Sequence, residues 1–211
     1  MPLRHLPDSF VAASEIPDVL DRACITFTPV NQINWPAYPY LPNVTVRMAL
    51  AGDALLIHYH VSEQAVLARY VSDGSDVWTE SCAECFILPD GSDAYYNIEC
   101  SCIGTLLVGH GAGRSGRQPL STGLLGTVDR WSSLGRSPLG LLSTPTTWDL
   151  TLAIPYSLFG DDAPSVQAGR FRFNIYKCGD DLPTPHFVSL FPIDAPQPDF
   201  HRPESFQRPT M

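Results

Sequence analysis

The sequence is poor in positive charge and contains no long hydrophobic run. Lysine occurs once, at Lys177, and 13 basic side chains stand against 22 acidic ones, for a formal net charge of −9. Proteins that bind nucleic acid contact phosphates through clustered Lys and Arg, so this balance argues against a nucleic-acid partner and also disfavours an anionic lipid surface. Apolar runs such as 54–57 are far shorter than the roughly 18 residues of a membrane helix, so we expect no membrane partner.

Two further absences concern the compartment and the cysteines. The first 14 residues lack an apolar run of signal-peptide length, which predicts a cytoplasmic protein, or a secreted or periplasmic one if the chain is trimmed. Six cysteines in 211 residues are too dilute for a small disulfide-built domain. With 44% hydrophobic and 17% charged residues and no obvious linker, residues 1–211 are expected to form a single globular domain.

Alternation of apolar and polar residues dominates the chain and predicts strands. It runs over 44–50, 55–61, 79–88, 93–103, 147–154 and 170–177. One short helix is expected over 14–23, where a serine and an early proline suit a helix start. The 20 prolines and 15 glycines supply turns, and 111–145 forms a long excursion. The pattern predicts an all-β antiparallel sandwich of immunoglobulin or jelly-roll type with long loops.

Turn positions set the register expected for two hairpins. In the first hairpin, Met48 pairs with Ile57 on the apolar face. In the second, a four-residue loop over 89–92 pairs Leu88 with Asp93. Because side chains alternate along a strand, this second register predicts which residues share each face.

One face of the second hairpin combines carboxylates, an amide and aromatic rings. The expected register places Glu84 opposite Asn97 and Cys82 opposite Glu99. A sugar presents CH faces that pack on aromatic rings and hydroxyls that hydrogen-bond to carboxylates, amides and Arg. The chain offers this set as Trp78, Glu84, Tyr95, Asn97, Glu99, Arg114 and Arg117. We therefore interpret this strip as a candidate ligand surface.

The spacing of Cys82, Cys85, Cys100 and Cys102 suggests a zinc site at first sight. Residues three apart on a strand point to opposite faces, and Cys100 and Cys102 share the face of Cys85. Four thiolates therefore cannot converge without a bulge, and small buried core residues are the better interpretation. We predict no metal ligands among them.

Motifs of other chemistries are weak. His58 and His60 share a strand face, but no third metal ligand is indicated, so a polar surface is the better interpretation. The chain has no G-x-S-x-G elbow, and the glycines of 109–118 match neither a P-loop nor a dinucleotide fingerprint. Glu84 and Glu99 lie on one flat face, which suits hydroxyl recognition better than bracketing a scissile bond. We expect no catalytic residues.

Segment 76–86, DVWTESCAECF, resembles the family 9 carbohydrate-binding modules, which are DOMON-like β-sandwiches often attached to xylanases. Further blocks follow in order, among them NWPAYPYLPNV, YYNIECSCIGTLL and PDFHRPESF, and together they run almost end to end. The resemblance implies a β-sandwich that binds a saccharide and is linked to carbohydrate catabolism.

The resemblance also implies site residues. It assigns saccharide contact at the end of the sheets to Trp78 and Glu84, and polar contact to Asn97 and Glu99. Six residues of straight strand span about 20 Å, so Trp78 must lie on a loop that folds back over Glu84.

A second aromatic wall and a calcium ion are further implications of the resemblance. The late segment 186–191 would supply the ring, but Leu190 stands where we expect Trp in related proteins, so Phe191 or Trp131 is the replacement. The acidic turns 73–76 and 90–93 are the candidates for a structural calcium ion, which nothing in the sequence requires.

The leading hypothesis is a non-catalytic protein that binds a mono- or oligosaccharide and needs no cofactor. One alternative is a glycan-acting enzyme with Glu84, Glu99 and His186 or His201 as acid and base. Another is a haem or redox module of the DOMON type, which would need axial His or Met, yet Met48 is expected to face the core. A last one is an interaction domain whose Phe-rich tail, 186–206, forms an interface. The sequence leaves the sugar and the oligomeric state open.

Overall fold

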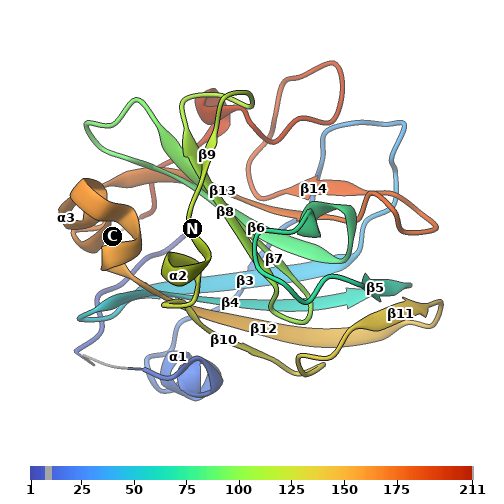
Figure 1. Cartoon of the computed structure of the whole chain (residues 1–211), viewed down its shortest axis with the longest axis horizontal. Coiled ribbons are helices and arrows are strands. Elements are labelled where there is room, and N and C mark those ends of the chain that lie inside the picture. Colours follow the sequence, from blue (N-terminus) through green and yellow to red (C-terminus); the bar gives the residue numbers. More distant parts are fainter. Residues whose placement is uncertain (8–10, 211) are drawn as a thin grey trace.

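The chain forms two antiparallel sheets packed face to face. A computed structural model describes residues 1–7 and 11–210. One sheet has five strands in the order β1-β3-β4-β12-β10, and the other has seven in the order β2-β14-β13-β6-β7-β8-β9. Figure 1 shows one sheet lying across the other. A ribbon of two strands, β11 and β5, extends at one end. The predicted all-β antiparallel sandwich is confirmed.

The elements have the following bounds. The five-stranded sheet contains β1 (Thr28–Pro29), β3 (Asn43–Leu50), β4 (Ala54–Glu63), β12 (Thr146–Pro155) and β10 (Asp129–Ser132). The seven-stranded sheet contains β2 (Gln32–Ile33), β14 (Phe187–Ser189), β13 (Phe171–Cys178), β6 (Cys82–Pro89), β7 (Tyr95–Ser101), β8 (Leu106–Gly111) and β9 (Gln118–Pro119). The ribbon consists of β5 (Val66–Ala68) and β11 (Leu139–Leu142). The helical segments are η1 (Ala13–Glu15), α1 (Ile16–Arg22), η2 (Val77–Thr79), α2 (Thr122–Leu125), η3 (Tyr156–Asp162), α3 (Ala163–Gln167) and η4 (Pro203–Ser205).

The helix predicted near the N-terminus is confirmed as η1 followed by α1. Pro17 lies in the first turn of α1, where its missing N–H costs no helix hydrogen bond. Ile16 and Leu20 pack against Leu56 and Ala153. Figure 1 shows α1 on the outer side of the five-stranded sheet. Across residues 1–7 and 11–210, no helix combines the length and the apolar character that a membrane crossing requires.

The first hairpin has the predicted register, and the second does not. In the β3–β4 pair, Met48 lies opposite Ile57 as expected. In the β6–β7 pair, Glu84 lies opposite Glu99, not opposite Asn97. The connection is longer than predicted because an extra turn forms after the β6 strand, in which the Ser92 hydroxyl accepts the Ala94 N–H at 3.3 Å.

This register error amounts to two residues, so every side chain of the hairpin keeps its predicted face. The cysteines show the consequence. Cys85, Cys100 and Cys102 are buried in the core between the sheets, whereas Cys82 lies on the other face with Cys178. The prediction that the four thiols of the apparent zinc motif do not converge is confirmed.

The single lysine is fully buried between the two sheets. Lys177 follows Ile175 on the core face of β13, and its Nζ forms an ion pair with Glu63 Oε2 of β4 at 2.8 Å. Both side chains are 0% exposed. Nζ also donates to the carbonyl of Cys178 at 2.8 Å and to Nε2 of His186 at 2.9 Å. Buried charges persist only when paired and hydrogen-bonded, and here every partner is supplied by the fold.

Two neighbours complete this buried cluster. The indole Nε1 of Trp148, on β12, donates to Glu63 Oε1 at 2.8 Å. Burial and the charge of Lys177 lower the pKa of His186 to about 2, so its ring stays neutral. Nε2 of the neutral ring accepts a hydrogen bond from Lys177 Nζ. The cluster therefore links β13 of one sheet to β4 and β12 of the other.

The Phe-rich tail packs within the chain. It runs across the outer face of the seven-stranded sheet, where Phe200 stacks on Tyr176 with ring centroids 4.2 Å apart and Phe206 meets Tyr95 edge-on at 5.5 Å. Phe206 is buried. These rings, proposed from the sequence as an interface, are largely occupied by intramolecular contacts.

Lys177→Met is expected to lower the free energy of unfolding by about 3–5 kcal/mol, because it leaves the Glu63 carboxylate buried without its cation. The double variant Lys177→Met, Glu63→Gln should recover much of the loss, since the glutamine amide would remove the buried charge and keep an oxygen for the Trp148 indole. Urea unfolding measures both.

The matched control for this prediction is Arg208→Ala, which removes an exposed ion pair with Asp90 at 2.9 Å and should cost no more than about 1 kcal/mol. A Lys177→Met loss as small as that of Arg208→Ala would contradict the assignment.

Candidate functional site

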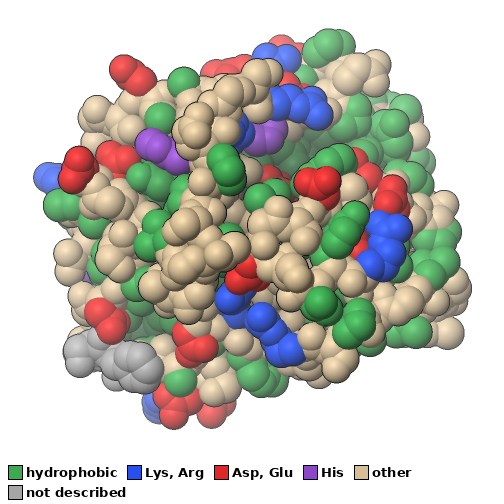
Figure 2. Space-filling view, in the orientation of Figure 1, with side chains coloured by type: hydrophobic (Ala, Val, Ile, Leu, Met, Phe, Trp, Pro, Cys, Tyr) green, Lys and Arg blue, Asp and Glu red, His purple; other side chains and the backbone are tan. Residues whose placement is uncertain are grey.

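A cavity of about 310 Å³ opens on the outer face of the seven-stranded sheet. Alternate residues of β6, β7 and β13 face this side and form the floor, and η2, the loop between β8 and β9 and segment 198–201 form the walls. In Figure 2, basic and histidine side chains gather at a hollow beside the loop between β8 and β9. Six of the residues predicted from the sequence line it: Trp78, Glu84, Asn97, Glu99, Arg114 and Arg117.

Trp78 reaches the cavity because the chain before β6 folds back over the sheet. It lies in the short helix η2, which places its side chain at the cavity with 40% of its surface exposed. The Trp78 carbonyl oxygen lies 3.3 Å from Cys178 Sγ, so η2 lies against the end of β13. A large, exposed aromatic ring at a cavity wall is a typical surface for stacking a ligand.

Two carboxylates share the floor. Glu84 and Glu99 lie directly opposite each other on β6 and β7 and are 2% and 4% exposed. Glu84 Oε1 accepts the Cys178 thiol at 3.0 Å. Glu99 Oε1 accepts the Asn97 amide at 2.7 Å, and Oε2 of Glu99 is buried without a hydrogen-bond partner in the described part of the chain. The floor therefore holds an unsatisfied polar atom, which is costly unless a ligand or water reaches it.

Burial controls the protonation of this pair. It raises the pKa of Glu84 well above its ordinary value, and the neighbouring Cys178 and Glu99 add to the effect. Burial also raises the pKa of Glu99 to about 7, against the opposing effects of the Asn97 hydrogen bond and the Arg117 charge. Two acids directly opposite each other cannot both ionise easily, so the floor carries protons at neutral pH.

Arg117 is a structural clamp. Its Nε donates to Asn97 Oδ1 at 2.7 Å, and its two terminal nitrogens donate to four backbone carbonyls. Those carbonyls belong to Tyr95, Gly109, Gly111 and Gly113. A guanidinium has five N–H groups, and all are used, so Arg117 positions Asn97 and holds the loop between β8 and β9.

This clamp explains the glycines of the loop. A Cβ on Gly109 would lie 2.8 Å from Asn97 Oδ1, and one on Gly111 would lie 3.2 Å from the Cα of Arg117. Side chains at these positions would push the arginine off the amide. The Gly-rich segment is thus a close-packed support for the floor.

Arg114 differs from Arg117 in being available. It lines the cavity, its side chain is 68% exposed, and Nη1 lies 3.8 Å from Asp199 Oδ1. At that distance and exposure the ion pair is weak. Of the two arginines predicted to assist binding, the one with uncommitted donors is Arg114.

Several cavity residues were not predicted from the sequence to bind a saccharide, although His201 was considered as an acid or base of the alternative enzyme. Phe187 and Phe200 line the cavity, and so do His201, Cys178 and Asp180. The Tyr95 hydroxyl lies 2.7 Å from His201 Nδ1, which fixes the histidine over the floor. The repeated aromatics of the PDFHRPESF block were a usable signal, but only the tertiary fold shows that they return to β6 and β7.

Two of the predicted ligand residues do not line the cavity. Tyr95 is 0% exposed and lies beneath it, with the Arg117 guanidinium 4.1 Å from its ring centroid. Phe191 packs against Phe173, with ring centroids 5.5 Å apart, because the chain turns inward after β14 and the Phe191 N–H bonds to Asn174. Phe191 therefore does not line the cavity, whereas Phe187 does.

The other expected replacements also lie elsewhere. Leu190 is buried in the core, and Trp131 lies on β10 of the five-stranded sheet. Met48 is buried in the core, as predicted. Of the two histidines considered as acid or base, His201 lines the cavity, whereas His186 is held by Lys177 between the sheets.

In each acidic turn considered for calcium, one carboxylate is paired with an arginine. Asp73 Oδ1 accepts Arg130 at 2.8 Å and the Leu106 N–H at 2.9 Å. Asp90 pairs with Arg208 at 2.9 Å. Calcium requires several carboxylate or carbonyl oxygens directed at one point, and an arginine already neutralises each of these carboxylates.

Comparisons with known proteins match this chain to carbohydrate-binding proteins. A family profile described as "Carbohydrate-binding family 9" matches residues 14–210. A crystal structure of a protein from Bacteroides uniformis, provisionally described as carbohydrate-binding, shares 37% sequence identity and a TM-score of 0.90, covering 98% of this chain and 95% of that one. A carbohydrate-binding module of family 9 from Caldicellulosiruptor kristjanssonii, solved with cellotriose, has 11% identity and a TM-score of 0.51, covering 90% and 83%. No curated protein gives a significant match.

Glu99→Gln is expected to change how stability depends on pH. The folded-state pKa of about 7 exceeds the ordinary value of 4.5, so between these values the folded chain holds a proton that the unfolded chain releases. The free energy of unfolding should therefore fall as pH rises from about 5 to 7, by at most about 3 kcal/mol for this group. The glutamine amide would keep an acceptor for Asn97 and remove this dependence.

The measurement is urea unfolding of the wild type and the variant across that pH range. A matched control is Glu204→Gln on η4, whose side chain is 65% exposed. Parallel curves for the wild type and Glu99→Gln would contradict the assigned protonation.

Proposed function

The chain belongs to carbohydrate-binding family 9, and on that premise we propose that it binds a mono- or oligosaccharide, without catalysing a reaction, in the cavity beside Trp78. We further place this binding in carbohydrate catabolism. The observation that carries the proposal is the junction of an exposed tryptophan with buried carboxylates and an amide in one cavity.

The chemistry of the cavity suits a pyranose. The Trp78 ring offers an apolar surface for the CH face of a sugar, and Phe187 and Phe200 extend the apolar lining. Glu84 Oε1 is taken by the Cys178 thiol, which leaves Oε2 for a ligand hydroxyl. Glu99 Oε2, buried without a partner, is the second candidate acceptor. A small number of polar groups at fixed positions between apolar walls is typical of a small-molecule site.

The size of the cavity favours a short ligand. Its volume of about 310 Å³ lies at the lower end of the roughly 300–1,000 Å³ typical of small-molecule pockets. We therefore propose that one or two sugar rings enter the cavity and that any longer chain extends into solvent. The cellotriose bound by the family 9 module of Caldicellulosiruptor kristjanssonii makes gluco-oligosaccharides the first ligands to test.

Trp78→Ala is expected to weaken saccharide binding at least about tenfold, a cost of about 1.4 kcal/mol, by removing the stacking surface. Glu84→Ala should weaken binding as much by removing an acceptor from the floor. Isothermal titration calorimetry with glucose, cellobiose, cellotriose and a panel of other sugars measures these effects.

The matched control is Trp131→Ala, since Trp131 is exposed to the same degree, 37% against 40% for Trp78, but lies on the other sheet. Equal effects of the two tryptophan variants, or no heat with any sugar in the panel, would overturn the proposed site.

The two arginines should separate affinity from stability. Arg114→Ala is expected to lower saccharide affinity while leaving the melting temperature unchanged, because its side chain is exposed and weakly paired. Arg117→Ala should lower the free energy of unfolding by about 2 kcal/mol or more, because it strands Asn97 and four backbone carbonyls. A melting temperature unaffected by Arg117→Ala would contradict the clamp.

A further inference from the structure

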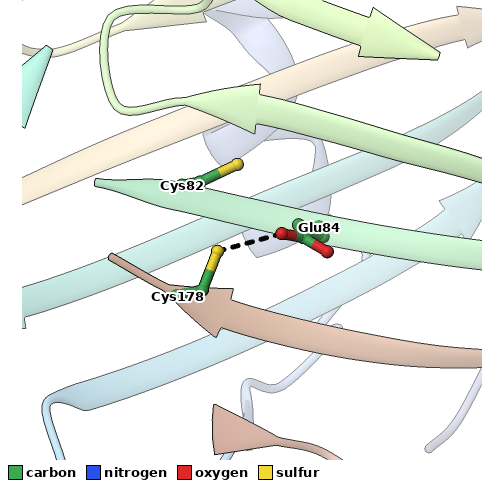
Figure 3. A group of neighbouring side chains, drawn as sticks. All are labelled: Cys82, Glu84 and Cys178. Atoms are coloured by element: carbon green, nitrogen blue, oxygen red, sulfur yellow. Dashed lines mark hydrogen bonds between the residues drawn. The ribbon is translucent and has the colours of Figure 1, made fainter. Parts of the chain in front are cut away.

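Three potential metal ligands converge at the inner end of the cavity floor. Cys82 and Glu84 are alternate residues of β6, and Cys178 ends β13 as the direct cross-strand partner of Cys82. Figure 3 shows these side chains on the same side of the two strands. Their ligand atoms all lie within 4.8 Å of one another, and all three residues are buried.

The sandwich core does not account for this group. Cys82 and Cys178 lie on the outer face of the sheet, away from the main core that holds Cys85, Cys100 and Cys102. Two thiols and a carboxylic acid are packed together, and the Glu84 carboxylate, 2% exposed, receives its hydrogen bond from a thiol, which is a weak donor.

Lys177 and Arg117 are committed elsewhere, and Arg114, whose side chain is 68% exposed, makes no ion pair with Glu84 in the described part of the chain. Lys177 adjoins Cys178 in the chain, but its side chain points to the opposite face and pairs with Glu63 at 2.8 Å. Arg117 spends its donors on Asn97 and backbone carbonyls. In the described part of the chain, no protein cation is directed at these three groups, which become anions when they lose their protons. A divalent metal ion would supply the positive charge that stabilises them.

We propose that Cys82, Glu84 and Cys178 bind a zinc ion at the floor of the cavity. The ion is held by two thiolate sulfurs and one carboxylate oxygen. Its fourth position faces the cavity, which Glu84 and Cys178 line, and a water molecule or a ligand hydroxyl fills it. The two thiols and the carboxyl release their protons to solvent as the ion enters. The site requires no bound saccharide, although it shares Glu84 with the proposed saccharide site.

The geometry suits zinc. In a tetrahedral site with Zn–S near 2.3 Å and Zn–O near 2.0 Å, ligand atoms lie about 3.5–3.8 Å apart. Glu84 Oε1 lies 3.0 Å from Cys178 Sγ, and the widest separation in the group is below 4.8 Å. Small side-chain rotations therefore bring all three atoms to coordination distance while the two central strands stay in place.

The donor set selects the class of metal. Thiolate sulfur binds the borderline and soft ions Zn²⁺, Co²⁺ and Cu⁺, whereas Ca²⁺ and Mg²⁺ require oxygen ligands. Two sulfurs and one oxygen thus exclude from this site the calcium ion that the sequence suggested elsewhere in the chain. Three protein ligands with one open position is the arrangement of zinc sites that bind an exogenous ligand.

The test is titration of the purified full-length protein, freed of metal by chelation and kept reduced with a phosphine, with CoCl₂ and then ZnCl₂. One equivalent of Co²⁺ should produce a near-ultraviolet thiolate-to-cobalt charge-transfer band, and one equivalent of Zn²⁺ should abolish it. All variants carry Cys24→Ser, which removes an exposed thiol from the background.

Cys82→Ser and Cys178→Ser should each lose the band and weaken zinc binding by more than the roughly 10–100-fold typical of losing an outer-shell partner. Glu84→Gln should keep the sulfur band and weaken affinity. Cys85→Ala is the matched control, because Cys85 lies on the same strand but points into the core, and it should bind as the wild type does.

Several results would overturn the proposal. They are the absence of a band in the folded wild type, its persistence in the Cys82→Ser, Cys178→Ser double variant, or its loss in Cys85→Ala. If the serine variants do not fold, X-ray absorption of zinc-loaded wild type decides: two sulfurs near 2.3 Å support the site, and a shell without sulfur refutes it. Sugar titrations of the metal-free protein test the proposed function separately, so either proposal can fail alone.

Discussion

The ion pair between Lys177 and Glu63 is the interaction on which the relation between the two sheets depends. A buried pair needs further hydrogen bonds to be stable, and here Trp148 donates to Glu63 while the Cys178 carbonyl and His186 accept from Lys177. Because Lys177, Glu63 and Trp148 lie on β13, β4 and β12, the pair and its indole neighbour link β13 to two strands of the other sheet. The next residue, Cys178, then faces outward and reaches the cavity floor.

The outer face of the seven-stranded sheet is organised by one arginine. Arg117 holds Asn97 and the Gly-rich loop together, and glycine is required where its guanidinium approaches the backbone. On this support lie Glu84 and Glu99, whose burial keeps protons on the floor. Glu84 is proposed as an acceptor for a saccharide hydroxyl and, together with two buried thiols, as a ligand for a metal ion. The positions proposed for the saccharide and for the metal ion therefore overlap at Glu84.

Alternation in the sequence predicted the strands and their faces well, because a residue's face depends only on its parity along the strand. Parity correctly separated Cys82 from Cys85 and placed Met48 in the core. The register of the second hairpin was predicted wrongly, because it depends on the length of the connection after Pro89. That connection is longer than expected and includes a turn in which the Ala94 N–H donates to the Ser92 hydroxyl. That error hid the direct pairing of Glu84 with Glu99, two carboxyl groups whose pKa values are raised chiefly by burial.

The sequence alone determined the fold class, the family and the chemical character of the site, since Trp78, Glu84 and Asn97 belong to one local pattern. Tertiary structure decided what no local pattern records. The rings that line the cavity are those of Phe187 and Phe200, and not that of Phe191. Arg117 supports the floor, whereas Arg114 is exposed at the cavity. Cys178 lies beside Cys82 and Glu84. These contacts join strands and loops that are distant in sequence, and their partners are chosen by the packing of the two sheets, which short-range periodicity does not specify.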